Sequence, residues 1–317
     1  RLVPALGRTA SNVPDRSLLD PPLAALLDAL GGADAVQLQM LGVDGAREAH
    51  RMLSAGAETG PVESATDRDL VGVPCRVYRP VGRSGTLPVL VWFHGGGWVL
   101  GDLDTADATA RALAGASGHM VVSVAYRLAP EHPFPAAVDD AWAVTSWLAS
   151  GGATELEGDP ARISVGGDSA GGNLAAVCAL LARDADVTLR HQVLVYPVTD
   201  VANESASYAE NGEGCLLTAD TMRWFIAEYV PEHRRSEWLA SPVLAPRLEG
   251  VASAYVLTVG FDPLRDEGDA YAVRLRDAGV TVEHDRVANA IHGFLDLSAV
   301  TPLAAQAVGR IAAFLGK

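Results

Sequence analysis

Short runs rich in apolar and β-branched residues alternate along this chain with longer segments whose apolar positions recur at helical spacing. The short runs lie at residues 73–78, 89–93, 121–125, 163–165, 191–196, 255–261 and 280–283. Helical patterns occupy residues 105–114, 138–148 and 173–181. This alternation predicts an α/β fold with a mostly parallel central sheet and helices on both of its faces.

The N-terminal part of the chain carries two helical patterns ahead of the first predicted strand. Asp20 can act as an N-cap before a helix whose apolar face lies within 23–30, and two glycines end that pattern. Asp44 can cap a second helix that runs to about Leu53. We expect these two helices to pack with the cap insertion of residues 201–246.

Residues 201–246 interrupt the strand–helix rhythm. This segment is polar at first and then carries large side chains at partly helical spacing: Trp224, Phe225, Ile226, Tyr229, Val230 and Trp238. Such a stripe is as typical of an ordinary core as of a lid, and its place between two predicted strands favours a lid. The chain therefore divides into N-terminal cap helices in 1–56, a core in 57–200 and 247–317, and a cap insertion in 201–246.

The pentapeptide Gly167-Asp168-Ser169-Ala170-Gly171 lies between a predicted strand and a predicted helix. G-x-S-x-G in this setting is typical of a nucleophile elbow, a strained turn that lifts a serine hydroxyl clear of the sheet. The amides after the serine lie at a helix N-terminus, which favours negative charge. Alone the pattern is weak, because a chain with 32 glycines produces such matches by chance.

A glycine run directly follows the buried strand 89–93, in the sequence HGGGW at 94–98. Backbone N–H groups of glycines can approach a reacting atom closely and stabilise a tetrahedral oxyanion. A plain glycine-rich turn explains the run equally well when it is taken alone. Together with the elbow downstream, it predicts an oxyanion hole built from the amides of Gly96, Gly97 and Ala170.

Among eight histidines, His292 is the candidate base, because it follows the β-type run 280–283 in a loop near the end of the chain. The other seven have ordinary structural settings. His284 and His191 lie in or beside strands, His50 and His233 in polar helical segments, and His119, His132 and His94 near other turns or strands.

The candidate acid is Asp262, because it directly follows the strand 255–261, and open α/β sheets build their sites at the carboxyl ends of strands. Asp200 also follows a strand and competes for the same role. Asp266 and Asp269 have the pattern of solvated charges at the start of the next helix.

The composition narrows the class of protein. Hydrophobic residues make up 49% and charged residues 20% of 317 residues, which is typical of a folded globular protein. The net charge of −15 disfavours binding to nucleic acid or to anionic membranes. No apolar stretch reaches the roughly 18 residues that span a bilayer, so we expect no stable membrane insertion.

Three cysteines are too few and too scattered for a disulfide framework or a structural zinc site. Cys178 falls in a helical pattern and is expected to be a small core residue. The N-terminal residues do not open a signal peptide. These features favour a reducing compartment, so we expect a cytoplasmic protein.

Five motifs in order resemble the bacterial hormone-sensitive-lipase-like branch of the α/β-hydrolases, which are carboxylesterases with a cap domain. They are HGGGW at 94–98, YRLAPEHPFPA at 126–136, GDSAGGN at 167–173, DPLRDEG at 262–268 and HGF at 292–294. The resemblance extends over nearly the whole chain, and the GDSAG elbow is similar to the larger subgroup. The chain order Ser, Asp, His also fits this fold.

This resemblance implies Ser169 as nucleophile, Asp262 as the acid and His292 as the base, with Gly96, Gly97 and Ala170 as the oxyanion hole. It implies small-molecule esters of short or medium acyl length as substrates, no metal or cofactor, and a homodimer as one option for the assembly. The run 126–136 is expected to be a structural brace beneath the site.

One departure from the family lies at residues 287–290, VANA, where relatives usually carry a glycine. Asn289 tolerates left-handed backbone angles, so the His292 loop can keep its shape. Two other functions remain open. An amidase or arylformamidase would use the same triad, whereas a hormone receptor similar to the plant gibberellin receptors would lack the triad histidine that is present here.

Overall fold

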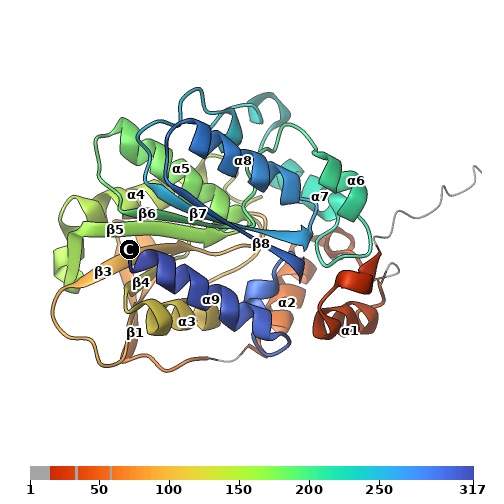
Figure 1. The fold of residues 1–317 in the computed structure, drawn as a ribbon, viewed down its shortest axis with the longest axis horizontal. Coiled ribbons are helices and arrows are strands. Elements are labelled where there is room, and N and C mark those ends of the chain that lie inside the picture. Colours follow the sequence, from red (N-terminus) through yellow and green to blue (C-terminus); the bar gives the residue numbers. More distant parts are fainter. Residues whose placement is uncertain (1–14, 33–34, 58) are drawn as a thin grey trace, which may run out of the picture.

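Eight strands form a single sheet in the order β1-β2-β4-β3-β5-β6-β7-β8 in the computed structural model, which describes residues 15–32, 35–57 and 59–317 (Figure 1). The β1–β2 and β2–β4 pairs are antiparallel and the remaining pairs are parallel. The expected α/β fold with a mostly parallel sheet is therefore confirmed. The strands are β1 (Ser64–Leu70), β2 (Val73–Arg79), β3 (Leu87–Phe93), β4 (Met120–Val124), β5 (Gly158–Asp168), β6 (His191–Val195), β7 (Ser253–Phe261) and β8 (Val282–Ile291).

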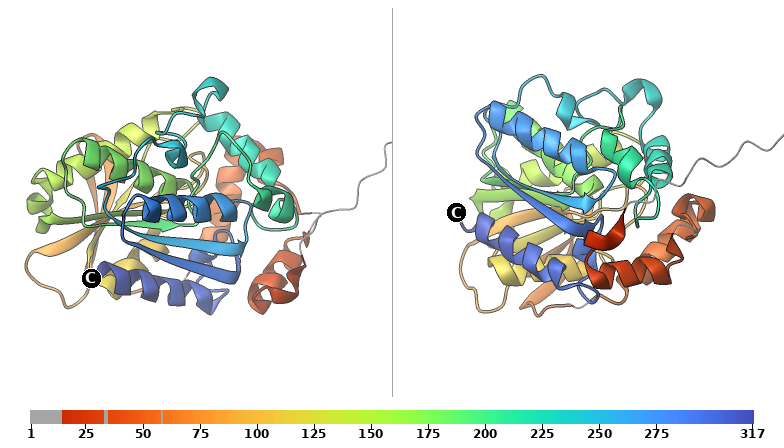
Figure 2. Two further views of the ribbon diagram at one scale, coloured as in Figure 1. Left: turned by 45° about the horizontal axis from the view of Figure 1, so that its top comes forward. Right: turned by 45° about the vertical axis from the view of Figure 1, so that its right-hand side comes forward.

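Helices cover both faces of this sheet (Figures 1 and 2). On one face lie α3 (Asp107–Ser117) and α9 (Pro302–Leu315), and on the other α4 (Ala136–Ala149), α5 (Ala170–Asp184) and α8 (Arg265–Asp277). Strand β3 explains why both faces are covered, because Val91 and Phe93 join the core on one side while Leu90 and Trp92 join the core on the other. Within the described ranges, no helix combines the length and apolarity needed to cross a membrane.

Two further groups of helices gather beyond the carboxyl ends of the parallel strands (Figure 2). One comes from the N-terminal part: α1 (Pro21–Ala29), the short 3-10 helix η3 (Leu38–Leu41) and α2 (Gly42–Ser54). The other lies between β6 and β7: α6 (Ala206–Asn211) and α7 (Ala219–Tyr229). Hydrogen bonds join them, from Thr218 Oγ1 to Gln37 Oε1 at 2.6 Å and from Thr221 Oγ1 to Gln39 Oε1 at 2.9 Å.

The strands at the two edges of the sheet differ most from the sequence-based prediction. We expected 73–78 to open the sheet, but β1 precedes it, and five of its seven residues are exposed. We placed the last strand at 280–283, whereas β8 runs from Val282 to Ile291. Both strands are open to solvent along an edge, so they carry polar side chains instead of the continuous apolar run by which buried strands are recognised.

The two predicted N-terminal helices exist, but neither is capped by the carboxylate we expected. Asp44 lies inside the first turn of α2, with Leu41 at the N-cap. Asp20 does sit at the N-cap of α1, yet its side chain makes no capping hydrogen bond. Its carboxylate instead accepts a hydrogen bond from Thr301 Oγ1 at 2.7 Å, which ties α1 to the start of α9. A tertiary partner has replaced the local one.

Candidate active site

Ser169 sits on a sharp turn between the end of β5 and the start of α5. Its backbone angles are φ 55° and ψ −118°, which a residue with a Cβ adopts only at a cost. The Ser169 amide donates to the carbonyl of Val195 at 2.9 Å, and its carbonyl accepts from the amide of Asn173 at 3.1 Å. These bonds hold the strained turn in place and direct the hydroxyl away from the sheet.

Close packing explains why this turn requires glycine. A Cβ on Gly171 would collide with the carbonyl oxygen of Phe93 at the end of β3. The elbow is thus pressed against the strand that leads into the HGGGW run. Packing alone brings these two motifs together, although they are about 70 residues apart in the sequence.

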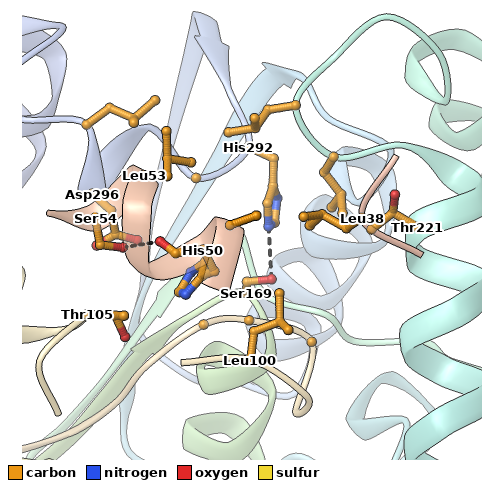
Figure 3. A pocket seen from close by; sticks show the side chains of 18 of the residues that line it. Leu38, His50, Leu53, Ser54, Leu100, Thr105, Ser169, Thr221, His292 and Asp296 are labelled. Carbon is orange, nitrogen blue, oxygen red and sulfur yellow. Dashed lines mark hydrogen bonds between the residues drawn. The ribbon is translucent and has the colours of Figure 1, made fainter. Parts of the chain in front are cut away.

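A continuous chain of hydrogen bonds links Ser169, His292 and Asp262. His292 Nε2 lies 2.9 Å from Ser169 Oγ, and His292 Nδ1 lies 2.8 Å from Asp262 Oδ2 (Figure 3 draws the first of these bonds). Asp262 is fully buried, and its other oxygen accepts the amide N–H of Leu264 at 2.8 Å. A carboxylate that accepts from Nδ1–H leaves Nε2 free to take a proton from the serine hydroxyl.

The carboxylates that competed for the acid role are engaged elsewhere. Asp200 Oδ1 accepts the backbone amides of Ala202 and Asn203, at 2.9 and 3.1 Å, so it stabilises its own turn. We expected Asp266 and Asp269 to be solvated, which is wrong for Asp269. Its Oδ1 accepts from Thr258 Oγ1 at 2.9 Å and lies 2.9 Å from His284 Nε2, because α8 packs against β7 and β8.

The Asp266 carboxylate is also hydrogen-bonded. It accepts from the amide of Ser207 at 2.9 Å and from Arg265 Nε at 2.8 Å. It therefore holds the start of α8 against α6, and the expectation of a free surface charge is wrong here too.

The amide N–H groups expected to form an oxyanion hole donate no hydrogen bond within the described part of the chain. Gly96 and Gly97 have φ angles of 110° and 61°, and both line the same cavity as Ser169. Ala170 is the first residue of α5, where helix amides lack a partner within the helix. No described carbonyl or side chain accepts a hydrogen bond from these three N–H groups.

Asp168 and Tyr126 hold the HGGGW run from behind. The Asp168 carboxylate accepts the Gly95 amide at 3.0 Å, and burial raises the pKa of Asp168 well above its usual value. Tyr126 donates to the carbonyl of His94 at 2.7 Å and stacks on the His94 ring at 4.4 Å. These contacts agree with the expected bracing role of the 126–136 run.

Ser169 and His292 open into a cavity of about 620 Å³ (Figure 3). Its walls come from the N-terminal helices, the HGGGW loop, the segment that enters α3, the elbow, the segment before and within α7, and the turn after β8. Most of the wall is apolar, with side chains that include Leu27, Leu38, Leu53, Leu100, Leu217 and Phe225. A cavity of this volume with few polar groups is typical of a site for a small organic molecule.

The aromatic stripe of 201–246 divides between the two interpretations we left open. Phe225 faces the cavity, whereas Tyr229 stacks on Trp98 at 4.5 Å in the core. Residues 215–217, just before α7, also line the cavity. Part of this segment therefore forms the wall of the site and part is ordinary core.

The departure at residues 287–290 has a different explanation from the one we expected. Asn289 lies within β8 and is not left-handed, and the left-handed position belongs to Gly293, with φ 81°. Strand β8 runs through residues 287–290 and ends only at Ile291, so these residues belong to the strand and not to a loop. His292 therefore follows β8 directly, as Asp262 follows β7.

Sequence reasoning missed three residues around the site. Tyr196 packs its ring 4.5 Å from His292, while His50 and Asp296 line the cavity. His50 was expected to be a structural residue on a polar helix. It follows buried Ala46 by four positions, so a histidine at core spacing was the available signal.

Comparison with known proteins identifies the fold and the family of this chain. Residues 90–296 match a protein family described by its α/β hydrolase fold. The chain is 43% identical over 306 residues to carboxylesterase NlhH of Mycobacterium tuberculosis, covering 92% of this chain and 93% of that protein. It is 37% identical over 299 residues to ethyl acetate hydrolase of Pseudomonas putida, covering 89% and 93%.

Solved structures lead to the same family. The ester hydrolase EH1AB1 from the metagenome of Lake Arreo, complexed with a bipyridine phosphonate derivative, is 40% identical with a TM-score of 0.90, covering 94% of this chain and 98% of that one. A thermostable esterase from Pseudomonas putida is 37% identical with a TM-score of 0.88, covering 94% and 97%. The chain thus belongs to the hormone-sensitive-lipase-like esterases of the α/β-hydrolase fold, a family of ester hydrolases.

Proposed function

We propose that this chain is a serine carboxylesterase that hydrolyses short- to medium-chain acyl esters through an acyl-enzyme intermediate. The observation that carries the proposal is the hydrogen-bond chain from Ser169 through His292 to Asp262 at the base of an apolar cavity. Burying a serine and a histidine side by side costs more free energy than filling the same space with apolar side chains. Packing alone therefore does not explain this pair.

In the first half of the reaction Ser169 Oγ attacks the ester carbonyl while His292 Nε2 takes its proton. His292 then gives that proton to the departing alcohol, and the acyl group stays on the serine. Water releases the acyl group by the same two proton transfers. Asp262 keeps the Nδ1–H tautomer of His292 and stabilises the imidazolium that forms.

The negative charge of each tetrahedral intermediate is assigned to the amides of Gly96, Gly97 and Ala170. Their lack of other partners in the described structure supports this role, because free N–H donors need no rearrangement as the charge develops. The reaction needs only groups of this chain and water.

The cavity supports a small-molecule ester as the partner of the site. We propose that 57–200 and 247–317 form the catalytic core, with a cap made of 1–56 and 201–246 that excludes water from the acyl-enzyme. The contacts of α1, η3, α2 and α7 with the cavity support this division.

Replacing the serine tests the proposal directly. Ser169→Ala should lower kcat for phenyl butanoate by roughly 10⁴-fold or more, the size of triad deletions in other hydrolases. Ser146→Ala on α4 serves as the matched control and should stay within about twofold of the wild type. Turnover by folded Ser169→Ala at a rate close to that of the control would refute the proposal.

A further inference from the structure

One wall of the active-site cavity is polar, in contrast to the rest. His50 and Ser54 come from α2, Thr105 and Thr109 from the segment that enters α3, and Asp296 from the 3-10 helix η7 (Phe294–Asp296). In Figure 3 His50, Ser54, Thr105 and Asp296 lie on one side of Ser169, with Leu38 and Thr221 on the other. The cavity therefore has chemically different sides.

The three hydroxyl groups of this polar wall already have partners in the protein. Ser54 Oγ donates to the His50 carbonyl at 3.0 Å, and Thr105 Oγ1 donates to the Asp102 carbonyl at 3.0 Å. Thr109 Oγ1 donates to Asp296 Oδ1 at 2.6 Å. None of these hydroxyls needs a ligand to complete its hydrogen bonding.

Two groups in the polar wall remain without a partner. Within the part of the chain that the structure describes, neither ring nitrogen of His50 makes a hydrogen bond. The protein encloses Nδ1, so Nε2 is the nitrogen that a ligand can reach. The second carboxyl oxygen of Asp296, Oδ2, likewise accepts no hydrogen bond from the described chain. Both side chains line the same cavity, and they make no hydrogen bond to each other in the described structure.

A polar group that is removed from bulk water and has no hydrogen-bond partner lowers the stability of the fold. Such a group is expected mainly where a ligand supplies the missing hydrogen bond. We propose that His50 and Asp296 form a hydrogen-bonding subsite for a hydroxyl group on the substrate ester, several carbon atoms from the scissile carbonyl. The inference rests on the proposed esterase function and narrows its substrate class. A hydroxyl fits both groups because it donates one hydrogen bond, here to Asp296, and accepts another, here from His50.

The electrostatics of the wall favour a neutral hydroxyl over an ammonium group. Burial raises the pKa of Asp296, so enclosure by the protein disfavours a full charge on this carboxyl group. Burial also lowers the pKa of His50 in spite of the nearby carboxylates of Asp296 and Asp102, which favours the neutral imidazole.

The test compares matched ester pairs that differ by one terminal hydroxyl. One series carries it on the acyl chain, as phenyl esters from hexanoate to octanoate, because shorter hydroxyacyl chains close to lactones. The other carries it on the alcohol, as acetates of hexanol to octanol and of the corresponding diols. We expect the wild type to prefer the hydroxylated member in one series by about tenfold in kcat/KM, the effect of one well-made hydrogen bond.

Substitution of either partner should remove that preference. His50→Leu and Asp296→Leu should each lower the ratio of kcat/KM for hydroxylated over plain ester by about tenfold. The His50 ring makes no hydrogen bond within the described protein, so His50→Leu is expected to fold even if Asp296→Leu does not. Leu38→Val, on the other side of Ser169, is the control and should change both members of a pair alike.

The outcomes separate the subsite from the esterase function. In an apolar cavity an added hydroxyl lowers kcat/KM, because it loses its water without replacement. A wild-type ratio at or below one for every chain length in both series, or a ratio that neither substitution alters, overturns the subsite. Failure to hydrolyse any of the plain esters would instead overturn the proposed function.

Discussion

At the scale of single residues, the site is assembled from three side chains that each follow a strand directly. Ser169 follows β5, Asp262 follows β7 and His292 follows β8. Parallel strands end at a common edge, so residues 123 and 30 positions apart come within hydrogen-bond distance. For Ser169 and Asp262 the position after a buried strand was readable from the sequence. His292 was predicted from its motif and its place near the end of the chain, because the true end of β8 was missed.

The choice between the two candidate acids gives a prediction at this scale. Asp262→Asn should lower kcat by about 10⁴-fold, because the amide favours the wrong tautomer of His292. Asp200→Asn should change kcat no more than about twofold, since that carboxylate serves a turn. Steady-state kinetics on phenyl butanoate decides the matter, and equal losses in the two variants would contradict the assignment.

His94 makes the stability of the protein depend on pH. Burial lowers the pKa of His94 to about 4, whereas an unfolded histidine titrates near 6.5. Below about pH 6.5 this histidine binds a proton in the unfolded chain but not in the folded chain. The free energy of unfolding therefore falls as pH falls. From about pH 7 to about pH 5 this group should remove about 2 kcal/mol.

Urea unfolding at the two pH values measures that loss. His94→Gln should reduce the difference between them, because the titrating group is gone. Substitution of the exposed His132 by Gln is the control and should keep the wild-type difference. The interpretation fails if the two variants respond to pH in the same way.

At the scale of elements, α2 is fastened to the loop that carries the proposed oxyanion donors. Arg47 donates to the carbonyl of Val99 at 3.0 Å and to that of Ala129 at 3.1 Å, and it pairs with Glu131 at 2.7 Å. Arg51, one turn later, pairs with Asp102 at 3.1 Å and with Glu48 at 3.8 Å, and its side chain is half exposed. Arg47 is therefore a positioning residue for the loop, whereas Arg51 is a surface contact.

Matched substitutions of the two arginines test this difference. Arg47→Met should lower kcat by about tenfold with a smaller change in KM, because small shifts of oxyanion donors weaken transition-state binding. Arg51→Met should stay within about twofold, as expected for an exposed ion pair. A loss confined to KM, or one of equal size in both variants, would contradict the positioning role.

The elements themselves were predictable in proportion to their burial. Strands β3 and β6 and helix α5 were found because burial on both faces demands an unbroken apolar pattern. Strand β1 was missed, and β8 was placed too early, because their exposed faces admit any polar residue. A buried position restricts the residue types that the sequence can carry there, whereas an exposed edge position restricts them little.

At the scale of the whole molecule, the cavity exists only because distant parts of the chain close around the sheet edge. Helix α1 contributes Leu27 and Leu30 to the wall. It is held by Asp20, whose amide donates to the Asn289 carbonyl at 2.9 Å and whose carboxylate accepts from Thr301 at 2.7 Å. The position of α1 therefore depends on the last strand and the last helix.

Loosening that anchor should affect substrate binding more than chemistry. Asp20→Ala removes one hydrogen bond and should raise KM for phenyl hexanoate about threefold, with kcat nearly unchanged. Asp28→Ala, on the same helix, removes an exposed carboxylate that pairs with Arg16 at 3.2 Å and should alter neither constant. An unchanged KM in Asp20→Ala would mean that α1 keeps its place without this bond.

The amino-acid sequence by itself determined the alternating α/β architecture, the two glycine-dependent turns and the serine, aspartate and histidine that end their strands. These features leave local signals, because a buried strand needs continuous apolar residues and a crowded turn needs glycine. The tertiary structure alone decided that Asp20 binds Thr301 and that His50 and Asp296 face one cavity. Such pairings depend on which surfaces come together in space, and no local pattern of hydrophobic and polar residues encodes that choice.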